Sequence, residues 1–430
     1  MTRMIDMSGV TVVVRGLALA IFLSWGVAQA KSIDVLHSFA GGSDGESPYG
    51  GLILDKTGNL YGTTYFGGGT GCSPYDSGCG TIFKVDTSGA ESVLYVFSGL
   101  SDGAFPNASL IEGKKGEFYG TAQQGGANYW GVVFEISTTG VESTLYSFAG
   151  GKDGGSPEGA LLADKQGNLY GTTYNGGGST ACVNGCGTVF QLTPPAVKGG
   201  AWTERVIYAF QGGNDGAGPS DGLVEDKAGD FYGTTQMGGN FSCSYAQGVG
   251  CGTVFKIASD GAESLLHSFA GPPDDGGTPW SGLTADRNGV LYGTTVYGGE
   301  NLDCSSNHQA CGTVYEITPD GSETVLHSFD YTKDGAYPFA GVLLDGNGDI
   351  YGATYNGGYY GCGCGTIFKL APDGKVTRLF VFADDGNGAS PAATPIADAM
   401  GNLYGTTVGG GNFRTCNAPF GCGTVYKLKK

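Results

Sequence analysis

The chain has 430 residues and a formal net charge of −18, with 40 Asp and Glu against 22 Lys and Arg. A surface this acidic repels nucleic-acid phosphates and anionic lipids, which excludes both as expected partners. Glycine supplies 83 residues, far above its usual share of about 7%. Because aromatic residues recur at fixed offsets and helical periodicity is absent, the composition favours short strands joined by tight turns.

The N-terminus has the order of a secretory signal peptide. Arg3 and Arg15 come before an apolar run over 16–26, and Ala28-Gln29-Ala30 forms a cleavage site. We expect residues 1–30 to be removed and residues 31–430 to be secreted or periplasmic. The apolar run is shorter than the about 20 residues of a spanning helix, and we expect no transmembrane segment or C-terminal anchor in the mature chain.

The rest of the chain contains seven copies of one pattern. A Tyr-Gly pair recurs, and in every copy a proline precedes its tyrosine by thirteen residues. Because this spacing never varies, the length differences between copies must fall elsewhere. The tyrosines are Tyr61, Tyr119, Tyr170, Tyr232, Tyr292, Tyr351 and Tyr404, and the prolines are Pro48, Pro106, Pro157, Pro219, Pro279, Pro338 and Pro391.

Apolar runs and turn residues predict four strands in the first copy. These strands cover 50–55, 60–65, 80–86 and 91–97, with tight turns at 56–59 and 87–89. Such a unit is typical of a propeller blade, so the sequence predicts an all-β, seven-bladed β-propeller of four-stranded antiparallel blades. The expected repeats lie near 40–97, 98–148, 149–210, 211–269, 270–329, 330–382 and 383–430.

The two ends of the repeat region predict how the ring closes. The last copy stops at its third strand, 423–428, whereas residues 32–39, which match 263–269, stand ahead of the first copy. We expect the segment 31–39 to complete the last blade as its fourth strand. Closure of this kind removes the exposed sheet edges of an open stack.

The repeated motifs are similar to those of a known family. D-G-x-x-P, L-x-x-D-x-x-G-x-L-Y-G-T-T-x-x-G-G and C-G-T-V-F-K resemble the Gloeobacter/Verrucomicrobia-type (GloVer) tandem repeat, over essentially the whole mature chain. The resemblance implies an exported bacterial repeat protein. Because this family carries no established activity, the resemblance implies no catalytic residues.

Twelve cysteines form six pairs, each within the loop between the second and third strands of one copy. An even count in an exported chain favours a disulfide inside each loop, and zinc is the alternative, although each loop offers only two thiolates. The small ring of the Cys362-Cys364 bridge is expected to be strained and easily reduced, and its oxidation state is left open. The predicted pairs are Cys72-Cys79, Cys182-Cys186, Cys243-Cys251, Cys304-Cys311, Cys362-Cys364 and Cys416-Cys422.

Acidic and histidine residues also follow the repeat. An Asp-Gly pair stands ahead of each proline except in the seventh copy, which has Asn387, and we interpret these side chains as caps of backbone N–H groups in turns. Calcium binding is the alternative, and no other cofactor is expected. Three histidines share a ring position with tyrosine, whereas His308 breaks the repeat. The weak calcium candidates are Asp44, Asp102, Asp153, Asp215, Asp275 and Asp334.

Both long connections of each copy emerge on the same end of the blades, and we expect this top face to be functional. Aromatic residues at the start of these loops or within them, among amides and glycines, suit sugar rings or a protein partner. The ligand-binding candidates are Tyr65, Phe66, Tyr129, Trp130, Tyr174, Tyr297, Tyr355, Tyr359 and Tyr360.

These features predict an exported binding propeller without catalysis, which recognises a glycan or a surface protein through its disulfide-stapled top-face loops. One alternative is an extracellular polysaccharide hydrolase or lyase, with His308, Asp303 and Glu300 as catalytic candidates. A calcium-stabilised structural scaffold is the other alternative. Neither the ligand nor the oligomeric state follows from the sequence.

Overall fold

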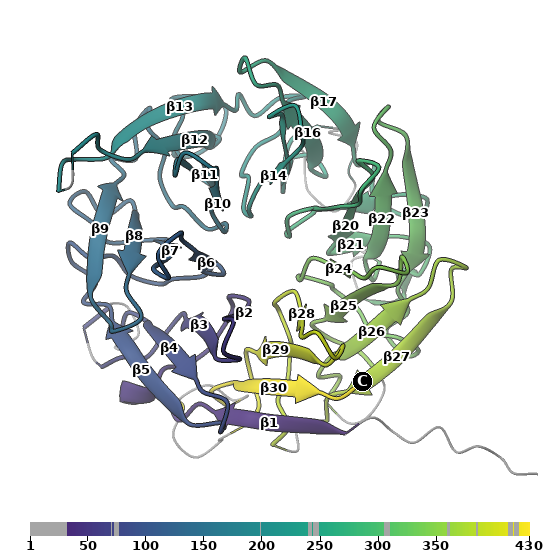
Figure 1. The fold of residues 1–430 in the computed structure, drawn as a ribbon. Coiled ribbons are helices and arrows are strands. Elements are labelled where there is room, and N and C mark those ends of the chain that lie inside the picture. The colour runs from purple at the N-terminus through teal and green to yellow at the C-terminus, as the bar shows by residue number, and fades with distance from the viewer. Residues whose placement is uncertain are drawn as a thin grey trace, which may run out of the picture. The chain divides into compact units, whose positions relative to one another are not determined.

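The repeats fold into blades arranged in a ring in the computed structural model (Figure 1). The structure describes residues 32–430 apart from 70, 73–76, 198, 240–242, 244–248, 305–309, 359–361, 384–385, 412–415 and 417–420. The side chain of residue 303 is also outside the description. The predicted signal peptide lies outside the described residues.

Each blade is a four-stranded antiparallel sheet, as predicted. Besides these blades, the loops contain a two-stranded sheet of β18 (Gly276–Gly277) and β21 (Tyr297–Gly298) and two short 3-10 turns, η1 (Gly42–Asp44) and η2 (Leu302–Cys304). In order from the channel outward, the blades are β2 (Ile53–Leu54), β3 (Leu60–Thr64), β4 (Thr81–Val85) and β5 (Glu91–Val96); β6 (Ile111–Glu112), β7 (Phe118–Ala122), β8 (Val132–Ile136) and β9 (Glu142–Ser147); β10 (Leu162–Ala163), β11 (Leu169–Thr173), β12 (Thr188–Thr193) and β13 (Thr203–Ala209); β14 (Val224–Glu225), β15 (Phe231–Thr235), β16 (Thr253–Ile257) and β17 (Glu263–Ser268); β19 (Thr284–Ala285), β20 (Leu291–Thr295), β22 (Thr313–Ile317) and β23 (Glu323–Ser328); β24 (Leu343–Leu344), β25 (Ile350–Thr354), β26 (Thr366–Leu370) and β27 (Val376–Val381); and β28 (Ile396–Ala397), β29 (Leu403–Thr407), β30 (Thr424–Leu428) and β1 (Ile33–Ser38).

The ring closes, as predicted, where the first strand of the described chain pairs with the last. β1 pairs antiparallel with β30, and Asp34 lies opposite Lys427. Figure 1 shows the purple N-terminal strand along the outer side of the yellow C-terminal strand. The expectation that the N-terminal strand completes the last blade is therefore confirmed.

Aromatic rings hold neighbouring blades together. A fully buried phenylalanine at the end of each outer strand meets an aromatic ring on the third strand of the next blade, edge to face, with centroids 5.0–5.6 Å apart. Such pairs add about 0.5–1.5 kcal/mol to the burial of the two rings. The pairs are Phe39–Phe83, Phe97–Phe134, Phe148–Phe190, Phe210–Phe255, Phe269–Tyr315, Phe329–Phe368 and Phe382–Tyr426.

Hydrogen bonds from the Tyr-Gly-Thr-Thr motif add a second contact between blades, close to the channel. In six blades the first threonine donates to the carbonyl of the second residue after the next blade's proline. Thr63 donates to Ala108, and Thr406 donates to Gly50 across the closure, each over 3.2 Å. These bonds hold the segments that line the channel.

The glycine of each Cys-Gly-Thr motif permits a close approach between adjacent blades. Gly187 adopts a φ of +96°, and a Cβ there would lie 2.6 Å from Cδ of Pro219 in the next blade. A side chain at this position would therefore displace the proline that precedes the channel-lining residues.

Candidate functional site

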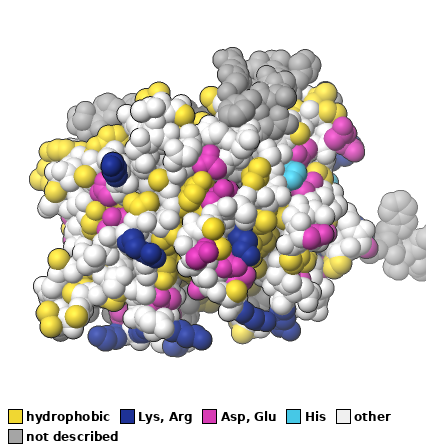
Figure 2. All heavy atoms as spheres, turned by 90° about the horizontal axis from the view of Figure 1, so that it is seen from above, with side chains coloured by type: hydrophobic (Ala, Val, Ile, Leu, Met, Phe, Trp, Pro, Cys, Tyr) yellow, Lys and Arg dark blue, Asp and Glu magenta, His cyan; other side chains and the backbone are white. Residues whose placement is uncertain are grey.

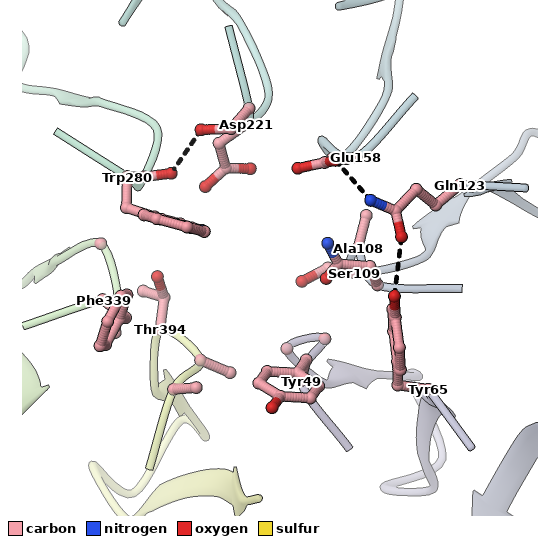
Figure 3. A pocket seen from close by; sticks show the side chains of 18 of the residues that line it. Tyr49, Tyr65, Ala108, Ser109, Gln123, Glu158, Asp221, Trp280, Phe339 and Thr394 are labelled. Atoms are coloured by element: carbon pink, nitrogen blue, oxygen red, sulfur yellow. Dashed lines mark hydrogen bonds between the residues drawn. The ribbon is translucent and has the colours of Figure 1, made fainter. Parts of the chain in front are cut away.

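The central channel holds a pocket of about 690 Å³ whose lining comes from all seven blades (Figure 3). Its volume falls within the ~300–1,000 Å³ of typical small-molecule sites. The lining residues stand directly before the innermost strands or directly after the second strands. The pocket therefore lies at the end of the channel where the long loops emerge.

The first set of lining side chains directly follows the seven repeated prolines. The residue before each proline adopts a left-handed φ, from 54° to 64°, six times without glycine. Such backbone conformations cost energy in L-residues and occur often at functional sites. The residues after the prolines are Tyr49, Asn107, Glu158, Ser220, Trp280, Phe339 and Ala392, and all seven line the pocket.

The second set directly follows the Tyr-Gly-Thr-Thr motif in five blades. These side chains are Tyr65, Gln123, Tyr174, Gln236 and Tyr355. In the other two blades the position is occupied by valine. Two positions of one repeat thus supply most of the pocket's side chains.

A chain of hydrogen bonds crosses three blades in the pocket wall (Figure 3). The hydroxyl of Tyr65 donates to Oε1 of Gln123 over 2.8 Å. Nε2 of Gln123 donates to Oε1 of Glu158 over 2.5 Å. The bond from Tyr65 orients the Gln123 amide, and the amide in turn holds the Glu158 carboxyl group in one position.

Burial perturbs both carboxyl groups of the pocket. Desolvation raises the pKa of Glu158 to about 7, although the hydrogen bond from Gln123 opposes the rise. Desolvation also raises the pKa of Asp221, against the lowering effect of hydrogen bonds from the backbone N–H groups of Gly282 and Gly222. Asp221 thereby joins the inner segments of neighbouring blades, whereas Glu158 contacts one amide side chain.

Aromatic rings occupy much of the remaining wall. Tyr49 and Trp280 expose 37% and 41% of their surface, although they are large and apolar. Tyr49 meets Tyr65 at a centroid distance of 5.6 Å, and Trp280 meets Phe339 at 5.4 Å, both edge to face. These contacts fix the ring planes while leaving apolar faces open to the pocket.

One buried polar group of the wall has no partner. Gln236 lines the pocket and is only 5% exposed, and its Nε2 makes no hydrogen bond. An unpaired buried donor costs about 1–3 kcal/mol, so an acceptor on a bound molecule would relieve this cost.

Four of the nine predicted aromatic residues line this pocket: Tyr65, Phe66, Tyr174 and Tyr355. Tyr129 lies apart from it and is 71% exposed, and Trp130 packs against the core between the second and third blades. Tyr297 stacks edge to face on Tyr337. Tyr359 and Tyr360 lie outside the described residues.

Glu300 is the one catalytic candidate whose side chain the structure describes. Glu300 is exposed in a loop and is not part of the lining. His308 lies outside the described residues, as does the side chain of Asp303. The carboxyl groups that do line the pocket, Glu158 and Asp221, were not singled out from the sequence.

The Asp-Gly carboxylates do cap backbone N–H groups, as in Ala40 N–H to Asp44 over 2.6 Å and Ser98 N–H to Asp102 over 2.7 Å. Each carboxylate also contacts a ring on the fourth strand, as in Tyr95 Oη to Asp102 over 2.9 Å. These bonds agree with the interpretation of the aspartates as turn caps, and calcium binding stays a prediction.

All six predicted cysteine pairs form disulfides in the structure. Their Cα atoms are 5.2–5.6 Å apart, within the usual range for such bonds. Six disulfides favour a non-reducing environment. Among the described residues, no helix is both long enough and apolar enough to cross a membrane.

Comparison with known proteins places the chain within one family. A family model described as the Gloeobacter/Verrucomicrobia repeat matches residues 24–182, 69–305 and 241–430. No curated protein matches the chain. A solved luciferin-regenerating enzyme is 12% identical over 93% of this chain and 95% of its own, with a TM-score of 0.44. A structure described as a candidate gluconolactonase is 14% identical over 69% of this chain and 80% of its own, with a TM-score of 0.37.

Proposed function

The chain belongs to the Gloeobacter/Verrucomicrobia repeat family, and we propose that this protein is an exported binding protein that takes a glycan into its central pocket without cleaving it. The single observation that carries the proposal is the composition of the pocket wall. Seven aromatic rings, three amides and two carboxyl groups line one cavity of about 690 Å³.

This composition can bind both the apolar C–H face and the hydroxyl groups of a sugar. The apolar faces of Tyr49 and Trp280 can stack on the C–H face of a pyranose ring, and their neighbours hold them in place. The amides of Gln123 and Gln236 and the carboxyl of Glu158 can bind hydroxyl groups. Among the described residues that line the pocket there is no Lys, Arg or His, so an uncharged glycan suits the pocket better than an acidic one.

Binding to a glycan array tests the proposal, with the mature, oxidised protein in calcium and in EDTA. We expect saturable binding with the glycan intact by mass spectrometry. Trp280→Ala should weaken binding about tenfold, because a lost stacking contact is worth about 1.5 kcal/mol. Tyr129→Ala is the matched control, since this exposed ring lies outside the pocket.

Each other outcome has a definite meaning. Failure of every glycan to bind would reject the proposal and favour a protein partner. Equal losses in the Trp280 and Tyr129 variants would place the binding surface on the loops instead of the pocket. Loss of binding in EDTA would make calcium part of the site.

Glycoside hydrolysis is the second candidate, because of Glu158. Burial raises its pKa to about 7, and a carboxylic acid that is protonated near neutral pH can serve as a general acid. Asp221 is the second pocket carboxyl, but its oxygens accept backbone N–H groups, which favours a structural role. Shortened products in the mass spectrum, absent with Glu158→Gln, would support hydrolysis over simple binding.

A further inference from the structure

A second kind of polar group recurs on the outer side of the ring, between adjacent blades. In each case a ring from an outer strand contacts the Asp-Gly carboxylate. In five interfaces a glutamate at the start of the next outer strand lies at the same place. Where the ring is tyrosine, the group offers a metal ion no nitrogen ligand. Where the ring is histidine, the group offers an imidazole nitrogen beside the carboxylate.

The first histidine group joins the last blade to the first, at the point of ring closure. His37 lies on β1, Asp44 in the following loop and Glu91 at the start of β5. Nε2 of His37 is 3.2 Å from Oδ1 of Asp44, and the Ala40 N–H holds Oδ2. Oε1 of Glu91 is buried and has no hydrogen-bond partner.

The second histidine group repeats this geometry between the fourth and fifth blades. Nε2 of His267 is 3.2 Å from Oδ2 of Asp275, which also accepts the Ala270 N–H. Oε1 of Glu323 is buried and without a partner, as in the first group. In both groups the ligand atoms of the three side chains lie within 4.8 Å of one another.

The third histidine of the repeat provides an internal contrast. His327 contacts Asp334 over 2.9 Å. The next outer strand, β27, begins with Val376, at the position where the five interfaces named above have glutamate. This interface therefore offers two candidate ligands where the other two offer three.

We propose that His37, Asp44 and Glu91 bind one zinc ion, and that His267, Asp275 and Glu323 bind a second. Three protein ligands of imidazole and carboxylate type, with water in the remaining position, form a common zinc site. Tetrahedral zinc with bonds near 2.0–2.2 Å places its ligands about 3.3 Å apart, so the glutamate has to close only a short distance. Calcium prefers oxygen ligands alone, which makes the histidine groups poorer calcium sites.

The location of the two groups gives zinc a structural role. Each ion would connect an outer strand of one blade to the outer strand of the next, and the first would join the last blade to the first. The groups are partly exposed, and a histidine among acidic side chains reaches the outer surface in Figure 2. Zinc could therefore enter from solvent without unfolding of the ring.

The repeat itself supplies the variants for a test. Tyrosine occupies the histidine position in three other blades, at Tyr95, Tyr146 and Tyr208. Each hydroxyl donates a hydrogen bond to the aspartate at the equivalent position of its own interface. Histidine-to-tyrosine substitutions should therefore preserve the fold while removing the nitrogen ligand. His37→Tyr and His267→Tyr each remove one proposed site, and His327→Tyr is the matched control.

The measurement is zinc content and zinc titration calorimetry on the untagged, oxidised mature chain after EDTA treatment and dialysis. We expect two zinc ions per chain, one in each single variant, none in the double variant and two in His327→Tyr. Zinc should also raise the melting temperature of the wild type but not of the double variant. Any other wild-type stoichiometry, bound zinc in the double variant, or a loss in His327→Tyr would overturn the proposal.

Discussion

Gln123 in the second blade donates a 2.5 Å hydrogen bond to Glu158 in the third, and both side chains face the central pocket. The same glutamine accepts a hydrogen bond from Tyr65 in the first blade. Glu158, a titratable group at the pocket, is thus held by a hydrogen-bond network that spans three blades. We expect its ionisation to change the affinity for a bound ligand.

Glycan affinity should change with pH through Glu158. Its pKa, raised to about 7 by burial, means that the carboxyl loses its proton as the pH rises through neutrality. Because a charge-assisted hydrogen bond to a sugar hydroxyl is about twice as strong as a neutral one, affinity should rise several-fold between pH 6 and 8. Titration calorimetry across this range should show the rise in the wild type and a flat profile in Glu158→Gln. A wild-type profile that matches the variant would contradict this role.

The stability of the ring should depend on pH through Glu204. Desolvation, and secondarily the charge of Asp153, raises the pKa of Glu204 from 4.5 to about 7. A carboxyl whose pKa is raised in the folded state stabilises that state fully below pH 4.5, and this contribution is lost as the pH rises through 7. In thermal melts, the melting temperature of Glu204→Gln should therefore fall less between pH 5 and 8 than that of the wild type. The exposed Glu225→Gln variant should follow the wild type, and an equal effect there would exclude a specific role for Glu204.

Closure of the ring should be as important for stability as any other blade interface. Phe39 on the N-terminal side is fully buried and meets Phe83 at 5.0 Å, as Phe148 meets Phe190 at 5.1 Å. We expect Phe39→Ala and Phe148→Ala each to lower the free energy of unfolding by about 3–5 kcal/mol in urea. A much smaller loss in Phe39→Ala would mean that β1 contributes little to the closed ring.

Removal of one loop disulfide should affect stability more than binding. Replacement of Cys182 and Cys186 by alanine removes a ring of few residues, whose closure is worth about 2 kcal/mol on the chain-entropy model. Glu158 precedes β10 and Tyr174 follows β11, so both lie outside the ring that this disulfide closes, and glycan affinity should change less than about twofold. Strong loss of binding with little loss of stability would instead locate the ligand on the stapled loops.

Much of the architecture could be predicted from the sequence because the repeats can be compared with one another. The strand 60–65 was expected, and β3 covers Leu60–Thr64, since alternating apolar residues and turn signals act locally. The fourth strand of the last blade and all six disulfides followed from a missing segment and from cysteine spacing.

The pocket was predicted only in part. Tyr65 and Tyr355 were chosen because they belong to the long loops, but the same argument selected Tyr129, which lies away from the pocket. Tyr49, Glu158 and Trp280 were missed, although the residue after each proline is the variable member of an otherwise fixed motif. That variability was the available signal for the missed position.

By itself, the sequence determined the number of blades, the strand order and the covalent links in each loop, because these depend on local periodicity and on spacing within one repeat. Only the tertiary structure decided that Tyr49 and Trp280, 231 positions apart in the chain, line one cavity. Ring closure brings the same repeat position of seven blades to a common axis, and this convergence has no counterpart in the linear order of residues. The burial that raises the pKa of Glu158 arises from the same convergence.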